Sequence, residues 1–186
     1  MDFNDDVQAI ACSAYGKLVA VSLLDFTIHL LHADTLKFNL HLYGHKLPAI
    51  ALAFSDDEQM LVSASSDKNL KVWSPIFGHC EKSLRAHDET VTGVAFLPGT
   101  HMVVSCGKDR QVKVWDLDRY ELVSGFPTAE VCAGVAAGSD GAFFFVAGEK
   151  GLRKWVRTTE QLFVEEERER ELEEQMEADA TRDDLS

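Results

Sequence analysis

The sequence predicts an all-β chain of about four repeated units, each of four short antiparallel strands, followed by an acidic C-terminal helix. Two observations carry this prediction. Short apolar runs alternate with turn-forming residues, and a nine-residue pattern that ends in tryptophan recurs along the chain. The 186 residues are 46% hydrophobic and 9% aromatic, so the chain can bury a core and is not disordered as a whole.

The clearest copies of the repeated pattern lie at residues 65–73 and 107–115. The first reads Ser-Ser-Asp-Lys-Asn-Leu-Lys-Val-Trp, and the second reads Gly-Lys-Asp-Arg-Gln-Val-Lys-Val-Trp. A weaker copy ends at Trp155, and a unit upstream has Leu31 in the tryptophan position. The acidic residues that stand six positions earlier are separated by 42, 42 and 40 residues. Such regular spacing indicates a structural repeat.

Within a unit, each apolar run is followed by turn formers, which indicates strands rather than helices. An acidic turn leads into the strand that ends in tryptophan, and a more polar fourth strand follows. A histidine stands 28 residues before the tryptophan in both middle units. This arrangement is typical of a WD-repeat β-propeller, here a partial one of about four blades. In the middle units the first, second and fourth strands are predicted at residues 50–54, 60–64 and 80–84, and at 91–96, 102–106 and 120–124.

Four residue types recur in the two middle units. They are His45, Ser63, Asp67 and Trp73 in one unit and His87, Ser105, Asp109 and Trp115 in the next. In WD repeats these types form a buried chain of hydrogen bonds from indole to hydroxyl to imidazole to carboxylate, which satisfies each polar group. A catalytic Ser-His-Asp triad has no reason to occur twice beside the same tryptophan. We therefore assign both sets a structural role and predict no catalytic residue and no enzyme activity.

The set is incomplete in the first and last units. Val21 and Leu31 take the serine and tryptophan positions in the first unit, and Phe145 is assigned to the serine position beside Trp155 in the last. Replacing a whole network by apolar groups costs little, whereas half a network leaves polar groups without partners. We therefore expect the two middle units to be the best ordered.

The repeat predicts a partial propeller over residues 1–164, with units at about 7–42, 43–84, 85–126 and 127–164. Residues 165–186 are predicted to form a charged helix and tail, because Glu-Arg pairs occur there without glycine or proline over residues 165–178. A closed seven-bladed ring needs about 290 residues at this repeat length. We expect the other blades to come from a longer polypeptide; completion by a partner chain and a compact four-blade ring are the alternatives.

Three further segments carry a resemblance to a known family. They are residues 42–48 (Leu-Tyr-Gly-His-Lys-Leu-Pro), residues 77–88, and residues 155–160 running into the acidic stretch 163–171. Together they resemble the end of the second propeller in the WD repeat-containing protein 3 family, over about two thirds of the chain. The resemblance implies a non-catalytic scaffold of the small-subunit processome, which acts in small-subunit ribosomal RNA processing in the nucleolus of the nucleus.

That resemblance also implies partners. These are other protein subunits of a ribonucleoprotein assembly and, directly or indirectly, a small nucleolar RNA or pre-ribosomal RNA. The alternative is a generic WD-repeat adaptor, such as a substrate receptor of a ubiquitin ligase. Such receptors usually carry Trp-Asp-x-Arg, and here Arg119 lies one residue too far from Trp115.

Lys68, Arg110 and Lys150 each follow the turn acid of their unit, so we expect them to form an arc on one face of the propeller. Two interpretations stay open: ordinary basic residues at exposed strand ends, or a docking site for RNA phosphate or an acidic peptide. The formal net charge of −13 argues against a general nucleic-acid wrapper. Twelve of the 31 acidic residues lie in residues 160–186, so much of this charge belongs to the tail.

The sequence predicts no metal, no cofactor and no small-molecule substrate. His29 and His32 are three residues apart, and on a strand such residues face opposite sides. The four cysteines are too far apart in sequence to suggest a zinc site and are expected to be free thiols. Phosphate-loop and dinucleotide motifs are absent. No charge-free stretch is long and apolar enough to cross a bilayer, so we expect no membrane association.

Overall fold

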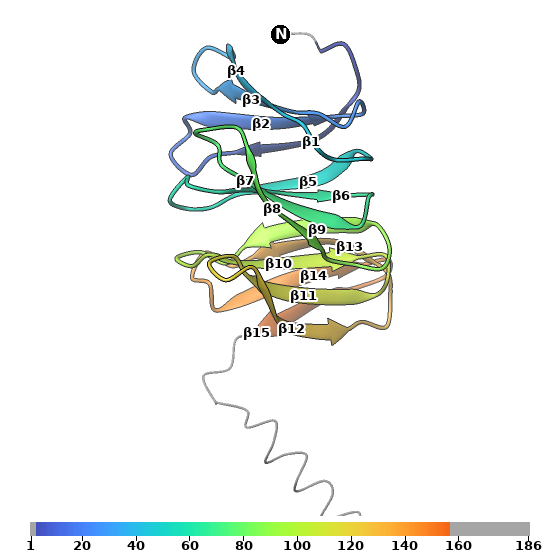
Figure 1. The fold of residues 1–186 in the computed structure, drawn as a ribbon. Helices are drawn as coiled ribbons and strands as arrows, with labels where there is room; N and C mark the ends of the chain where they lie inside the picture. The colour runs from blue at the N-terminus through green and yellow to red at the C-terminus, as the bar shows by residue number, and fades with distance from the viewer. Residues whose placement is uncertain (1–2, 157–186) are drawn as a thin grey trace, which may run out of the picture. The chain divides into compact units, whose positions relative to one another are not determined.

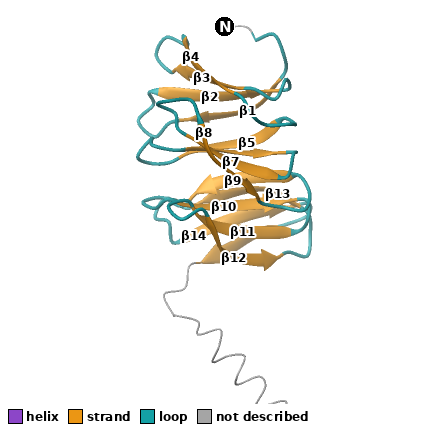
Figure 2. Ribbon diagram, in the orientation of Figure 1, coloured by secondary structure: helices purple, strands orange, loops and turns teal. Residues whose placement is uncertain are grey.

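The computed structural model describes residues 3–156, which form four antiparallel sheets (Figure 1). The described part of the chain contains strands, turns and loops and no helix (Figure 2). In each sheet the strands are hydrogen-bonded in sequence order. The all-β prediction is therefore confirmed. The helix predicted at 165–186 lies outside the described residues.

We call the four sheets blades 1 to 4. Blade 1 contains β1 (Val7–Cys12), β2 (Leu18–Leu23), β3 (Ile28–His32) and β4 (Phe38–Leu42). Blade 2 contains β5 (Ala49–Phe54), β6 (Leu61–Ser65), β7 (Asn69–Trp73) and β8 (Cys80–Arg85). Blade 3 contains β9 (Val91–Phe96), β10 (Met102–Gly107), β11 (Gln111–Asp116) and β12 (Glu121–Pro127). Blade 4 has three described strands: β13 (Cys132–Ala137), β14 (Phe143–Gly148) and β15 (Leu152–Val156).

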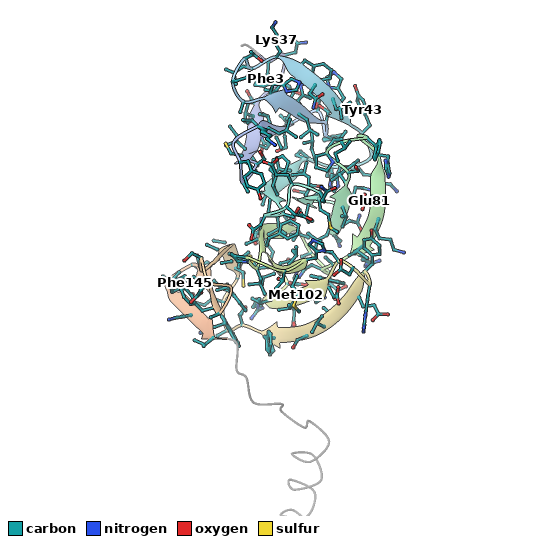
Figure 3. The ribbon with its side chains drawn as sticks, turned by 90° about the vertical axis from the view of Figure 1, so that its left-hand side faces the viewer. Phe3, Lys37, Tyr43, Glu81, Met102 and Phe145 are labelled. Carbon is teal, nitrogen blue, oxygen red and sulfur yellow. The ribbon has the colours of Figure 1, made fainter. Side chains whose placement is uncertain are left out.

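The blades pack face to face in chain order. The first strand of each blade, β1, β5, β9 or β13, contacts the first strand of the next. Figure 3 shows blade 4, which carries Phe145, beside blade 3, which carries Met102. An apolar cluster fills each space between neighbouring blades; between blades 1 and 2 it includes Leu30, Leu61 and Trp73. The core of this fold therefore lies between the sheets.

The second strand of each blade explains why these segments are so apolar. All five residues of β6 are buried, because blade 1 covers one face of blade 2 and blade 3 covers the other. Side chains of a strand point alternately to the two faces, so a strand covered on both sides needs a continuous run of small or apolar residues. The runs in the sequence therefore mark strands covered on both faces.

Candidate functional site

The four predicted network residues of blade 2 form one hydrogen-bonded chain. Trp73 Nε1 donates to Ser63 Oγ over 2.8 Å, and Ser63 Oγ lies 2.6 Å from His45 Nε2. His45 Nδ1 lies 2.8 Å from Asp67 Oδ2. An ionised carboxylate can only accept, so Nδ1 carries the proton and Nε2 accepts from the serine hydroxyl. The chain thereby ties the loop before β5 to β6, β7 and the turn between them.

Blade 3 repeats the same chain. Trp115 Nε1 donates to Ser105 Oγ over 2.9 Å, and that oxygen lies 2.9 Å from His87 Nε2. His87 Nδ1 lies 2.9 Å from both carboxylate oxygens of Asp109. A side chain at Gly107 would come within 2.9 Å of both Asp109 and His87, so a larger residue here would force these two side chains to shift. The structure brings together all four predicted residues in each middle blade.

The electrostatics of each hydrogen-bonded chain favour the neutral form of its histidine. Burial lowers the pKa of His45 and of His87, although the neighbouring aspartate opposes the shift. Burial alone would raise the pKa of Asp67, but hydrogen bonds from His45 and from the Lys46 amide outweigh it and lower that pKa. The Ser63 hydroxyl is fully buried between its two partners. This geometry satisfies polar groups and leaves no hydroxyl open to a substrate.

In blade 1, apolar side chains replace the hydrogen-bonded chain. Val21 and Leu31 take the serine and tryptophan positions and are buried in one cluster, on which Phe3 packs. Phe3 stands 42 residues before His45, so it takes the histidine position; that spacing could have revealed it, but sequence reasoning missed it. The turn acid Asp25 instead accepts hydrogen bonds from the hydroxyl and the amide of Thr27.

The turn of blade 4 is one residue tighter than that of blade 3. In blade 3 the innermost pair across the turn is Cys106 with Val112, whereas in blade 4 it is Ala147 with Leu152. The Gly148 amide donates to the carbonyl of the residue at 151, also a glycine, so only two residues form the loop. The shorter turn shifts β14 by one residue relative to β15, the strand that carries Trp155.

This shift overturns the assignment of Phe145 to the serine position. Trp155 pairs with Phe144, so the residue two positions further along β14, Val146, occupies that place. Successive side chains of a strand face opposite sides, and Phe145 therefore lies on the other face of the sheet. Valine has no hydroxyl, and the buried Trp155 Nε1 has no hydrogen-bond partner among residues 3–156. Glu149, which stands at the turn-acid position, is exposed. The Lys150 amide donates a hydrogen bond to the carboxylate of Glu130.

The three candidate binding residues are exposed at the turns between the second and third strands of blades 2, 3 and 4. Lys68 and Arg110 have left-handed backbones, with φ of 73° and 60°. Arg110 and Lys150 line one surface hollow of about 290 Å³, and Lys68 does not line it. Glu130 and Glu149 line the same hollow, so its charge is mixed.

A second feature, between blades 2 and 3, was not predicted from the sequence. His101 Nδ1 lies 2.7 Å from Asp118 Oδ1, and its Nε2 lies 3.1 Å from Asp57 Oδ2. The hydrogen bond to Asp118 raises the pKa of His101, with Asp57 adding to the shift. A hollow of about 450 Å³ lies here, lined also by Asp56 and Asp116. Within residues 3–156, no group of three or more His, Cys, Asp or Glu side chains is arranged to hold a metal.

The sequence is similar to those of known WD-repeat proteins. Residues 1–162 match the family described as the WDR3 second beta-propeller domain. The chain is 53% identical over 49 residues to WD repeat-containing protein 3 homolog of Dictyostelium discoideum and 52% identical over 48 residues to WD repeat-containing protein 3 of Homo sapiens. It is 41% identical over 52 residues to U3 small nucleolar RNA-associated protein 12 of Saccharomyces cerevisiae. These segments cover 26–28% of this chain and 5–6% of the relatives.

Solved structures share the fold. A structure of U3-55K superposes with a TM-score of 0.79 at 20% identity, covering 84% of this chain and 50% of that one. The crystal structure of RRP9 WD40 repeats gives 0.77 at 21% identity, covering 83% and 49%. At such identities the likeness concerns the fold alone. It confirms the prediction of a partial WD-repeat propeller.

Proposed function

This chain belongs to the family of the WDR3 second β-propeller domain, and on that premise we propose that it is a non-catalytic WD-repeat scaffold for ribonucleoprotein assembly. The match across residues 1–162 is the observation that carries the proposal. The more specific role is small-subunit ribosomal RNA processing in the nucleolus, as part of the small-subunit processome. One relative is named for its association with U3 small nucleolar RNA, which supports this choice.

Two features of the middle blades support a scaffold. The serine hydroxyls that resemble nucleophiles, Ser63 and Ser105, are fully buried and are shared between an indole and an imidazole. A nucleophile must reach its substrate, so these hydroxyls fit a structural role. The two hydrogen-bonded chains, one in blade 2 and one in blade 3, also tie the strands of each blade together. A blade held rigid in this way suits a binding surface for partners.

The proposed docking surface is the arc of Lys68, Arg110 and Lys150, which we assign to an acidic segment of a partner protein. A nucleic-acid backbone presents a uniform row of negative charge and favours continuous basic surfaces. Here Glu130 and Glu149 share the hollow with two of the basic residues, so the arc offers separate basic points that suit the individual carboxylates of a protein segment better than a continuous phosphate backbone. Contact with RNA is then made through other subunits.

The test is affinity purification of the tagged chain from cells that assemble ribosomes. The wild-type chain should co-purify small-subunit assembly proteins together with U3 small nucleolar RNA. Reversing the arc by Lys68→Glu, Arg110→Glu and Lys150→Glu should lower recovery of the proteins several-fold. The matched control reverses three exposed basic residues at other turns: Lys17→Glu, Lys37→Glu and Arg119→Glu.

The control variant should bind like wild type. Failure of the wild-type chain to enrich any assembly component would contradict the scaffold role. Equal recovery with the arc variant and the control would remove the arc as the docking surface while leaving the scaffold role intact. RNA recovery that falls while the proteins stay bound would replace the acidic protein segment with RNA as the arc's ligand.

A further inference from the structure

Four large apolar side chains are exposed where blades 1 and 2 meet, at the end of the blades that carries the arc. Leu24 and Phe26 belong to the turn between β2 and β3, and Tyr43 and Leu47 belong to the loop between β4 and β5. Their exposed fractions are 42%, 39%, 66% and 43% in that order. Within residues 3–156, none of the four belongs to the apolar clusters that form the core. The fold therefore does not use these side chains for its own packing.

Backbone pairing and one hydrogen bond bring the four residues together. Ile28 pairs with Leu42 across β3 and β4, and Tyr43 (labelled in Figure 3) follows this pair directly, so it lies beside the turn between β2 and β3. The Ser22 hydroxyl of blade 1 donates to the carbonyl of Ala49 in blade 2 over 2.8 Å. Each of the two exposed leucines stands two positions from one of these bonded residues. We call the four side chains the apolar patch.

The apolar patch continues the arc into blade 1. Phe26 directly follows the turn acid of its blade, as Lys68 and Arg110 do in blades 2 and 3. All three residues have left-handed backbones, with φ of 74°, 73° and 60°. The same backbone geometry at the same position gives the three side chains equivalent places on successive blades. The row of turn residues therefore begins with an aromatic side chain and continues with basic ones.

Phe26 occupies a backbone conformation that costs it free energy. A bulky residue with positive φ is strained, whereas glycine adopts this conformation freely. The side chain gains nothing from the core, because it packs into none of the apolar clusters of residues 3–156. Strain that is kept at an exposed turn is typical of sites that bind a ligand.

We propose that the apolar patch binds a large apolar side chain of the same partner segment whose acidic residues dock on the arc. This inference rests on the docking surface proposed above and adds the part that selects the segment. Charge placement supports it: Lys46 is exposed next to Leu47, and Lys68 is exposed on the adjacent turn. Acidic residues that flank the apolar one therefore meet basic side chains. Burial of apolar surface adds affinity that salt does not screen.

The composition of the apolar patch favours a protein segment over RNA. Nucleobases stack on aromatic rings, but Leu24 and Leu47 offer no flat face for stacking. The exposed Asp25 stands between Leu24 and Phe26 in the turn, and its carboxylate would repel the phosphates beside a stacked base. An apolar side chain of a protein can pack against the leucines and the aromatic rings alike, with no phosphate beside it.

Fluorescence anisotropy with the full-length chain and three labelled probes tests the proposal. The first probe is a short peptide of aspartate and serine with one central leucine, the second has serine in place of that leucine, and the third is a single-stranded uridine oligonucleotide. The wild-type chain should bind the leucine peptide several-fold more tightly than the serine peptide. Phe26→Gly should remove this preference without lowering the midpoint of denaturation, because relief of the left-handed strain offsets the greater freedom of glycine in the unfolded chain.

The matched control is Phe77→Gly, which removes an aromatic side chain that is 75% exposed at the other end of β7 from Lys68. It should keep the preference for the leucine peptide. Equal binding of the two peptides by the wild type, a preference that survives Phe26→Gly, or a Phe26→Gly variant less stable than the wild type would overturn the proposal.

Reversal of the three charges of the arc separates this proposal from the docking surface on which it rests. If the patch fails but charge reversal still weakens both peptides, the arc stands without the patch. If neither peptide binds, or charge reversal changes nothing, both fail. Tighter binding of the oligonucleotide than of the leucine peptide, weakened by Phe26→Gly, would make the patch a site for RNA and overturn the proposal.

Discussion

Blades 3 and 4 place a tryptophan at the same point of the third strand, yet only blade 3 gives the indole N–H a partner. Trp115 donates to Ser105, whereas Trp155 faces Val146 and its N–H has no partner in the described part of the chain. The difference comes from one residue fewer in the turn, because a shift of one position along a strand exchanges its two faces. Small changes in turn length can therefore remove an entire polar chain from a repeat.

Blade 1 shows the other way of losing the chain. Phe3, Val21 and Leu31 replace the histidine, the serine and the tryptophan together, and a single apolar cluster results. Leaving one buried donor without a partner costs about 1–3 kcal/mol, whereas replacing both partners by apolar groups is nearly neutral. The comparison predicts that blade 4 bears a cost that blades 1, 2 and 3 avoid.

The largest expected effect is the removal of the central hydroxyl in blade 3. Ser105→Ala leaves the Trp115 N–H and the His87 Nε2 acceptor buried and unpaired, so the free energy of unfolding should fall by about 2–4 kcal/mol. Denaturant unfolding measures it. Ser83→Ala, at an exposed site, is the control and should change stability by less than about 0.5 kcal/mol. Equal effects of the two substitutions would show that the hydrogen-bonded chain of blade 3 contributes nothing to stability.

A matched pair of tryptophan substitutions compares blades 3 and 4 directly. Trp115→Phe and Trp155→Phe remove the same volume, and the difference between them reports the N–H group together with the deeper burial of Trp115. Trp115→Phe should lower the free energy of unfolding by about 1–2 kcal/mol more than Trp155→Phe, because only the second removes an unpaired donor. Denaturant unfolding of both variants provides the measurement. A larger loss for Trp155→Phe would contradict the comparison.

The polar chains also make stability depend on pH. His45 and His87 have lowered pKa values in the fold, so the unfolded state binds protons first as pH falls below about 6.5. The free energy of unfolding should therefore decrease on acidification from pH 7. Asp67, whose folded pKa is also lowered, adds a further loss when pH falls toward about 3.8 and below.

A variant of blade 3 that imitates blade 1 sharpens this point. With His87→Phe, Ser105→Val and Trp115→Leu, the decrease in stability between pH 7 and pH 5 should become smaller than in the wild type. Unfolding curves at several pH values measure the slope. An unchanged slope would mean that His87 does not carry the effect.

The smallest expected effect concerns His101, and its sign is opposite. Its folded pKa is raised, so its contribution is present below the unfolded pKa of about 6.5 and is lost as pH rises through the folded pKa. His101→Gln should cost less than about 1 kcal/mol at pH 6, because the side chain is 34% exposed, and nothing at pH 9. A cost that persists at pH 9 would assign the effect to packing.

The sequence predicted the repeat and the members of both polar chains, because a buried network needs the same residue types at the same spacing in each copy. It did not predict the register of β14. The acid stands six residues before the tryptophan in both of the last two units, so that spacing does not reveal a shortened turn. His101 was missed because its partner Asp57 lies 44 residues away in another blade, a contact that only the packing of blades creates.

Hydrogen exchange of the indole N–H groups tests the central claim most directly. The chain has three tryptophans, so its NMR spectrum should show three indole resonances, assignable by single Trp→Phe substitutions. Trp73 and Trp115, whose N–H groups donate to buried serines, should exchange much more slowly than Trp155. If Trp155 exchanges as slowly as the other two, or if those two exchange as fast as Trp155, the polar chains do not distinguish the middle blades from the last.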